Sequence, residues 1–491
     1  MPAVAACRIS VVVLGGMLVV LLGGCTLVPE YARPANHASS AEDALAADRL
    51  AAERGTLPVE QSAAHRTSRW WESYGDAQLN KWIAQLAADN LDLRAAAERI
   101  VQADEQVRIQ RGGWWPAVGL TSNGARSFAP GPGGGLGGSQ QRVYTSSVDA
   151  GATISWQIDL FGRVRNAVAS AEYSALASAM DHSALLQTLI AELVSRRVAL
   201  ALLLREIAIQ QDIVQSRAQT LSTVSRRYEL GVKNASAVDV HTARENLTSA
   251  RAQLVLLQQQ MAETLLVVDV LLNQRPGALQ GVETLFPVLP PNDGPPIETP
   301  LALLDQRPDI RGSELRLMAA NAGIGIAVAD LFPDLTISAS RGFNNDQFGG
   351  LLTNSNAVGV IAGKISARLF EGGRLRAQIR LRESRMRELT ADYARTVLVA
   401  MAEVETALIQ SRFLGEQIDN LQAGVVASRQ AEVLAQERYQ RGITPLLELL
   451  EAQRRRQNAE RSLLAAQRAS WSARINLHLA LGGDWLVEER L

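Results

Sequence analysis

The sequence has few of the residues that build metal centres, disulfides or catalytic sites. Both of its cysteines fall within the first 25 of 491 residues, so the rest of the chain holds no disulfide framework. Five histidines are scattered, with no pair at the spacing of helical metal ligands. Nucleophile elbows, phosphate loops and dinucleotide-binding fingerprints are also missing. The sequence therefore predicts neither an enzyme nor a metalloprotein.

The charges show no excess of one sign. Lysine and arginine number 49 against 50 aspartates and glutamates, so the chain lacks the basic field that nucleic-acid binding requires. Apolar residues make up 47% of the chain, which supplies a large core and excludes a disordered protein. Beyond the N-terminus no segment has about 18 uninterrupted apolar residues, so no transmembrane helix is expected there.

The N-terminus has the pattern of a lipoprotein signal. Arg8 precedes an apolar run over 9–22, which is too short to span a bilayer comfortably and suits a signal peptide. The run ends in Leu-Gly-Gly-Cys at residues 22–25, a small-residue cleavage site placed directly before a cysteine. We expect the Cys25 thiol to carry a covalent lipid and Cys25 to become the first residue of the mature chain.

Two very long helices are predicted, each followed by a shorter helical arm. Residues 163–230 contain no glycine or proline, and residues 374–441 contain only two glycines and no proline. A continuous helix of this length measures about 100 Å, which indicates coiled-coil-like packing and not a compact domain. The shorter arms are expected over 239–273 and 446–481.

These helices belong to an internal repeat. Gly162 and Gly231 are 69 residues apart, and Gly373 and Gly442 have the same separation. Each second glycine follows an Arg-Tyr pair by the same number of residues. Because both blocks keep their internal spacing, we interpret the chain as a duplicated architecture.

Strand signals lie between the helical parts. Residues 148–160 alternate between apolar or small side chains and polar ones, which is the pattern of a strand with two different faces. Hairpins are expected at about 117–161 and 334–370, with strands as long as tilted membrane strands. Two hairpins supply four strands, and four strands cannot close a membrane barrel alone. The chain must then oligomerise, unless these strands lie outside a membrane.

The predicted organisation has four parts. It consists of a signal peptide (1–24), a lipid-anchored linker (25–68), a first repeat (69–285) and a second repeat (286–491). Each repeat contains a helix, a β-hairpin and a long helical hairpin, the last over 163–273 and 374–481. The fold class is therefore α+β.

Six motifs resemble one known family in the right order along the chain. They include Trp-Trp-Glu-Ser-Tyr at 70–74, Asp-Leu-Phe-Gly-Arg at 159–163, Gln-Arg-Pro-Asp-Ile-Arg at 306–311 and Leu-Phe-Glu-Gly-Gly-Arg at 369–374. The mature N-terminus from Cys25 and Leu-Phe-Pro at 331–333 complete the set. The chain resembles the outer membrane factor lipoproteins, the OprM and NodT branch of the TolC-like family.

The resemblance implies a homotrimer in the Gram-negative outer membrane. Each chain would give four strands to a shared twelve-stranded barrel and its long helices to a periplasmic tube. The family docks on a periplasmic adaptor protein and an inner-membrane transporter, commonly of the proton-driven RND type, and passively conducts drugs or other toxic solutes outward. No cofactor is implied apart from the lipid on Cys25, and no nucleic acid.

The family closes its channel at the periplasmic helix tips, which correspond here to the start of the last helical arm. Glu448 and Glu451 would form two stacked carboxylate rings in a trimer, and Leu447 would add an apolar ring. Arg454 lies three residues after Glu451 and is expected to pair with it. Whether Asp239 in the first hairpin makes a tip contact, and whether the channel is open or closed, is left undecided by the sequence.

Two alternatives remain at this point. The same channel would serve as the outer-membrane exit of a type I protein secretion system, and long helices alone would suit a structural coiled-coil lipoprotein of the periplasm. The alternating strands disfavour the second alternative, because a periplasmic spacer needs no strands with an apolar face. The identity of the pump and the range of exported solutes do not follow from the residues.

Overall fold

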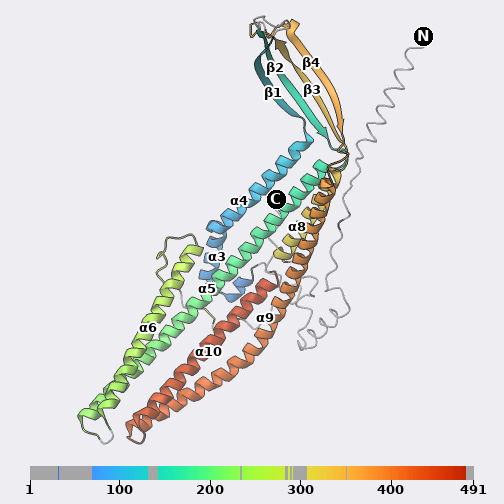
Figure 1. The fold of residues 1–491 in the computed structure, drawn as a ribbon. Coiled ribbons are helices and arrows are strands. Elements are labelled where there is room, and N and C mark those ends of the chain that lie inside the picture. Colours follow the sequence, from blue (N-terminus) through green and yellow to red (C-terminus); the bar gives the residue numbers. More distant parts are fainter. Residues whose placement is uncertain are drawn as a thin grey trace, which may run out of the picture. The chain divides into compact units, whose positions relative to one another are not determined.

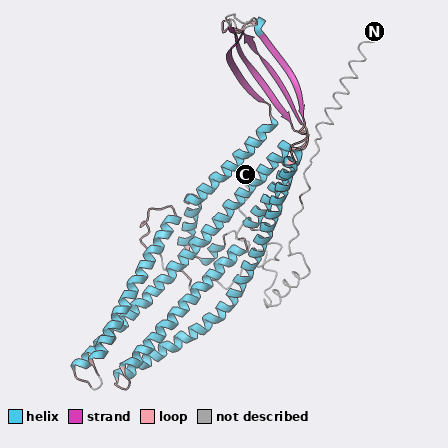
Figure 2. Cartoon of the chain, in the orientation of Figure 1, coloured by secondary structure: helices cyan, strands magenta, loops and turns pink. Residues whose placement is uncertain are grey.

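A computed structural model describes residues 31, 69–130, 142–232, 235–281, 286–287, 290, 307–349 and 351–482. The predicted signal peptide, Cys25 and nearly all of the expected linker lie outside the described residues. Within them, the chain consists of long helices and one four-stranded sheet (Figures 1 and 2). The α+β prediction is confirmed.

The helices and strands follow one another in the predicted order. The first repeat contains α3 (Ala77–Asp89), α4 (Leu91–Arg111), β1 (Ala117–Pro130), β2 (Arg142–Ile158), α5 (Arg163–Glu229) and α6 (Ala237–Leu271). The second contains α8 (Pro308–Ala329), β3 (Asp334–Asn345), β4 (Ala357–Ser366), α9 (Arg374–Gln440) and α10 (Leu446–Ala480). Short 3-10 turns η3 (Trp70–Tyr74), η4 (Gly112–Trp114) and η5 (Asn354–Asn356) complete the described elements.

The repeat is visible in the lengths of its helices. Both α5 and α9 have 67 residues, and both α6 and α10 have 35. The long helices end in the same way, because Gly231 and Gly442 adopt left-handed φ angles of 62° and 74° that a side chain would disfavour. The amide of the residue after each glycine then donates to the carbonyl five positions earlier, which satisfies an orphan carbonyl. The glycines that mark the repeat in the sequence are therefore helix stops.

The chain forms two compact units, and each repeat contributes to both. The first unit comprises 99–178 and 313–392, and so contains the sheet with the helical segments next to it in sequence. The second unit contains the described parts of 69–98, 179–312 and 393–482. The two repeats are therefore not separate compact bodies.

In the first unit the four strands form an antiparallel sheet in the order β1-β2-β3-β4. The register between β1 and β2 is continuous from the pair Ala117 and Ser155 to the pair Pro130 and Arg142. Side chains two residues apart, and those directly opposite on neighbouring strands, share a face of the sheet. The register therefore assigns each strand residue to one of two faces.

One face of the sheet is apolar and the other is polar. The apolar face carries Val118, Leu120, Phe128, Tyr144, Val148, Ile154, Trp156, Leu335, Ile337, Phe343, Ile361 and Ile365, with Ser122, Arg126, Arg142, Ser146, Arg341 and Asn345 as polar exceptions. The polar face carries Thr121, Asn123, Asp149, Thr153, Ser155, Gln157, Thr336, Ser338, Ser340, Asn344 and Lys364, with Val143, Val358 and Val360 as exceptions. Leu120 and Ile361 are each 85% exposed in the single chain, so the described residues do not cover the apolar face.

A group of ion pairs holds the helix-side end of the sheet. Asp330, just after α8, and Asp334, at the start of β3, lie within 3.2–3.9 Å of the guanidinium groups of Arg163 and Arg368. Gln157 of β2 also donates to Asp334 at 2.9 Å. Two arginines balance two aspartates, so this junction is electrically neutral.

The second unit has the largest core. Residues of α3, α5, α6 and α10 pack around Trp471, which is fully buried with Leu193 and Leu272. Inside this unit Asp76 caps α3 by accepting from two backbone amides, and its second oxygen lies 2.7 Å from Arg197 Nε. Both side chains are almost completely buried, so each compensates the desolvation of the other.

One described helix, α6, is long and apolar enough to cross a membrane by length and composition. An 18-residue window of it has a mean hydropathy of 1.4, and only 22% of that window is buried. The helix forms a hairpin with α5, because Gln210 Nε2 donates to the Ala250 carbonyl at 2.8 Å. The apolar window is thus surface that the single chain leaves open.

A close approach of β2 and β3 leaves no room for a side chain at Gly342. Gly342 of β3 lies directly opposite Gly151 of β2, and a Cβ on Gly342 would lie 2.6 Å from the Ala150 carbonyl oxygen. We expect Gly342→Ala to force the strands apart and to lower the free energy of unfolding by about 1–3 kcal/mol. Thermal unfolding of the purified protein, followed by circular dichroism, measures the loss.

The matched control is Gly363→Ala in the neighbouring strand β4, where a Cβ would meet nothing within 4 Å. This variant should unfold like the wild type. Equal melting temperatures for Gly342→Ala and Gly363→Ala would show that the strands separate at no cost.

Candidate functional site

The residues that the sequence selects lie in the first turns of α10. Leu446 and Leu449 face inward and are 5% and 2% exposed. The opposite side of the helix is exposed or half-exposed, and we call its four residues the aperture stripe: Leu447, Glu448, Glu451 and Arg454. Glu448, Glu451 and Arg454 follow at intervals of three residues, and Leu447 lies four residues before Glu451, which places all four on the same broad side of the helix. Leu447 is 75% exposed, an unusual position for a leucine.

An apolar cluster fixes the position of the stripe. All four helices of the two hairpins contribute to it, with Val224 from α5, Ala243 from α6, Ala435 and Tyr439 from α9, and Leu446 and Leu449 from α10. Because the packed face of α10 is held in this way, the aperture stripe must point away from the cluster. The hairpin tips are side by side in Figure 1.

Glu451 forms the ion pair that the sequence predicted and one more. Its carboxylate accepts from Arg454 Nε and Nη2 at 2.9 and 2.8 Å, and from Arg455 Nε at 3.0 Å. Hydrogen bonds from these two arginines hold the pKa of Glu451 at about 2. Glu451 therefore stays ionised at any physiological pH, and its charge is more than balanced by two guanidinium groups on its own helix.

The two hairpins are joined at the tip by a contact that the sequence analysis missed. Arg227, near the end of α5, donates from Nη1 to the Tyr439 carbonyl of α9 at 2.6 Å, and its guanidinium lies 4.8 Å from the centre of the Tyr439 ring. Both residues belong to the repeated Arg-Tyr pairs. The repeat signalled their importance, but it did not indicate that the arginine of one copy meets the tyrosine of the other.

Asp239 has a local role at the start of α6. Its carboxylate accepts from the Ser236 amide at 3.0 Å and from the Ser236 hydroxyl at 2.8 Å, while Ser236 Oγ accepts from the Asp239 amide at 3.2 Å. This reciprocal arrangement is a capping box, which satisfies two orphan helix donors. Asp239 also lies near enough to Tyr439 to raise the pKa of its phenol, after the larger effect of burial.

Beyond the apolar cluster at the hairpin tips, the two hairpins meet through polar side chains. Gln453 of α10 donates to Thr220 Oγ1 of α5 at 3.3 Å, and Arg217 of α5 donates to Gln457 Oε1 at 2.9 Å. Arg217 also donates to the side chain of Asn246 in α6 at 2.6 Å. Buried polar pairs of this kind fix the register of packed helices, because a shifted helix would leave them unpaired.

The same layer contains a charged group inside the second hairpin. Arg456 of α10 pairs with Glu432 of α9 and with Glu460, and Glu460 also accepts from Arg429 Nε at 2.8 Å. Burial raises the pKa of Glu432, and Arg456 opposes that rise. At this level α9 and α10 are therefore held together by ion pairs.

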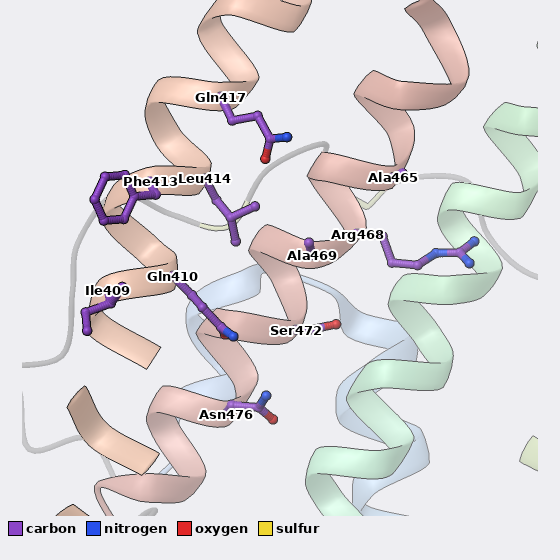
Figure 3. Close-up of a pocket in the computed structure, with 10 residues that line it drawn as sticks. All are labelled: Ile409, Gln410, Phe413, Leu414, Gln417, Ala465, Arg468, Ala469, Ser472 and Asn476. Atoms are coloured by element: carbon purple, nitrogen blue, oxygen red, sulfur yellow. The ribbon is translucent and has the colours of Figure 1, made fainter. Parts of the chain in front are cut away.

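A shallow groove lies between α9 and α10. Ala465, Ala469 and Ser472 follow one another at helical spacing on α10 and leave room beside Gln410 and Leu414 of α9 (Figure 3). The groove is open to solvent, and Phe413 at its edge is 58% exposed. Its lining contains no cluster of acids, bases or nucleophiles. Among the described residues, no three His, Cys, Asp or Glu side chains are placed to hold a metal ion.

Comparison with known proteins identifies relatives over nearly the full chain. Residues 82–274 and 300–483 match the model of the family described as outer membrane efflux protein. OprJ, an outer membrane protein of Pseudomonas aeruginosa, is 29% identical over 472 residues, covering 96% of this chain and 95% of that protein. The toluene efflux pump outer membrane protein TtgC of Pseudomonas putida is 28% identical over 480 residues, covering 95% and 94%.

The fold is also that of solved structures. The outer-membrane channel OprN superposes with a TM-score of 0.80 at 28% identity, covering 94% of this chain and all of that one. The four strands and two long helical hairpins therefore form the fold of a single chain of an outer-membrane channel.

Proposed function

Because this chain belongs to the outer membrane efflux protein family, we propose that it is the exit duct of a three-component pump. In this arrangement a periplasmic adaptor protein and an inner-membrane transporter of the RND type deliver solutes, and the duct conducts them passively across the outer membrane. The observation that carries the proposal is the sheet with one apolar and one polar face, continued in sequence by two helices of 67 residues. An apolar face suits lipid, and a polar face suits a water-filled lumen.

We infer that the functional unit is a homotrimer. β1 and β4 are the outer strands of the sheet, and the described chain offers them no further partners. Unpaired strand edges are not tolerated in a hydrocarbon environment, so β1 of one chain must pair with β4 of the next. The largely unburied apolar window of α6 also calls for a neighbouring chain.

The assembly and the channel are tested together. The intact protein, purified in mild detergent, should have a protein mass of about three chains by light scattering, and it should form discrete channels in planar bilayers. A single chain with native strand content would contradict the closed-barrel argument. Trimers that never conduct, even with the aperture substitutions below, would contradict the channel.

We propose that the aperture stripe narrows the periplasmic mouth of the trimer. Three copies of Leu447 would form an apolar ring, and Glu448 and Glu451 would form two levels of carboxylates. The pairing of Glu451 with two arginines refines this expectation. Both arginines, Arg454 and Arg455, pair with Glu451. Glu448 is therefore the carboxylate of the stripe for which the described residues show no ion pair. Cation preference would therefore depend mainly on Glu448.

Single-channel recordings distinguish the two glutamates. Glu448→Ala should weaken cation selectivity and block by multivalent cations. Glu451→Ala should shift selectivity toward anions, because it leaves Arg454 and Arg455 uncompensated. The double variant should conduct more than the wild type, since both polar constrictions are removed. If conductance, selectivity and block are unchanged in all three variants, the constriction is elsewhere.

We also propose that Cys25 carries a covalent lipid. The residues before it, Leu-Gly-Gly, are the support for this, and they lie outside the described part of the chain. Cys25→Ser should abolish incorporation of labelled fatty acid, while Cys7→Ser, which lies before the cleavage site, should leave it intact. Labelled lipid on the Cys25→Ser protein would refute the assignment. Assembly should survive, because the sheet itself binds the membrane.

A further inference from the structure

Four side chains form a compact group at the end of the sheet far from the helices. Phe128 of β1 and Tyr144 of β2 are directly opposite partners, and their ring centres are 6.1 Å apart. The guanidinium of Arg126 lies 5.0 Å from the centre of the Tyr144 ring, and that of Arg142 lies 5.2 Å from the centre of the Phe128 ring. Each arginine thus contacts the ring on the other strand. We call Arg126, Phe128, Arg142 and Tyr144 the quartet.

The quartet projects from the apolar face of the sheet. Because the register of β1 and β2 is continuous, the even-numbered residues of both strands share one face, and Leu120 and Ile154 are among them. Phe128 and Tyr144 are 62% and 55% exposed. The group is therefore accessible from the side of the sheet that faces lipid, not from the lumen.

The spacing of aromatic residues places the quartet at the outer surface of the membrane. Trp156, whose indole N–H donates to the Trp114 carbonyl at 3.0 Å, marks the helix-side end of the apolar face. Tyr144 is twelve residues from it along β2, which corresponds to about 40 Å of strand and, at a tilt of about 40°, to about 30 Å across the bilayer. If Trp156 lies at the inner interface, the quartet lies among the outer head groups.

The chemistry of the group selects an anion. A guanidinium that lies over an aromatic ring keeps the N–H groups at its edge available, and the ring restricts its motion. Among the described residues, neither Arg126 nor Arg142 forms an ion pair with a carboxylate. Phosphate oxygens pair with guanidinium edges of this kind, and the apolar face below accommodates acyl chains. These features together suit a lipid whose head group carries phosphate.

Other arginines of the first unit lack this combination. Arg163 and Arg368 are compensated by Asp330 and Asp334 at the helix-side end. Arg341 also projects from the apolar face, but it has no ring contact and its strand neighbours Ala152 and Gly359 are small. The quartet thus differs from these other arginines in three ways: its arginines form no described ion pair, they lie over aromatic rings, and they lie at the level of the outer head groups.

We propose that the quartet is a binding site for phosphorylated lipid head groups of the outer leaflet. The site rests on the outer-membrane placement of the chain and not on the aperture or on any exported solute. It anchors the outer end of the β1–β2 hairpin at a defined depth. A lipid bound there also covers part of the exposed apolar face that the protein leaves open.

Binding of a fluorescent diphosphoryl lipid A to the intact, detergent-solubilised protein tests the proposal by anisotropy. Arg126→Gln combined with Arg142→Gln should weaken binding at least about tenfold, as expected for the loss of charge-assisted hydrogen bonds. Removing the phosphates from the probe should weaken binding to the wild type similarly and should have little further effect on the variant. Tyr144→Leu should weaken binding while both charges remain.

The control is Lys364→Gln, which removes one positive charge from the polar face of the same sheet. It should bind the probe like the wild type, whereas Arg126→Gln alone should not. Because the quartet side chains are exposed, the variants should assemble normally, and light scattering verifies this. Equal affinity of the wild type and the double arginine variant, or equal affinity for the two probes, would overturn the site. A loss of affinity in Lys364→Gln equal to that in Arg126→Gln would reduce it to a non-specific charge effect.

Discussion

The structure depends first on the two open edges of its sheet. Four strands in the order β1-β2-β3-β4 leave β1 and β4 without outer partners in the described chain. In water such an edge would be solvated, but in a hydrocarbon layer each unpaired amide or carbonyl costs several kilocalories per mole. The edges are therefore the main support for the proposed pairing between copies of the same chain. In the proposed closed barrel the two faces meet different solvents, so the adjacent residues Ile154 and Ser155 would face lipid and lumen.

The helical part solves a different problem, because very long helices must keep one register without a continuous apolar interface. Apolar packing is concentrated in the large core around Trp471 and in the tip cluster around Tyr439. Between them α10 presents buried Gln453, Gln457 and Glu460. Such groups add little net stability, but a shifted helix would leave them unpaired. Directional polar contacts thus fix the register of the hairpins, while the apolar ends hold them together.

Much of the fold follows from the sequence for identifiable reasons. A run without glycine or proline predicts α5, and a run with two glycines and no proline predicts α9. Gly231 and Gly442 end these helices because only glycine readily takes the required φ. Strict alternation predicts β2 and its faces.

The contact of Arg227 with Tyr439 does not follow from the sequence, since pairing between helices depends on a register that no single helix encodes. The contacts within the quartet do not follow from the sequence either. The alternation of side chains along each strand assigns its four residues to one face, but only the β1–β2 register brings each arginine to the ring on the opposite strand. The capping box of Ser236 and Asp239 was available from the sequence, and the spacing of its two residues is the signal that was overlooked.

The charges of the aperture stripe show why residue type alone does not define a constriction. From the sequence, Glu448 and Glu451 are equivalent carboxylates one helical turn apart. In the structure Glu451 is bound by Arg454 and Arg455, whose hydrogen bonds keep it ionised and whose two positive charges exceed its one negative charge. The arginines lie further along α10 than the carboxylate, and the two carboxylates and two guanidinium groups of Glu448, Glu451, Arg454 and Arg455 sum to zero charge. Three bare carboxylates would repel one another at a narrow mouth, whereas three copies of a neutral group can approach closely at less electrostatic cost. The pairing is therefore compatible with the proposed narrow aperture at the level of Glu451, and it leaves Glu448, one turn closer to the start of the helix, as the carboxylate of the stripe without a described ion pair.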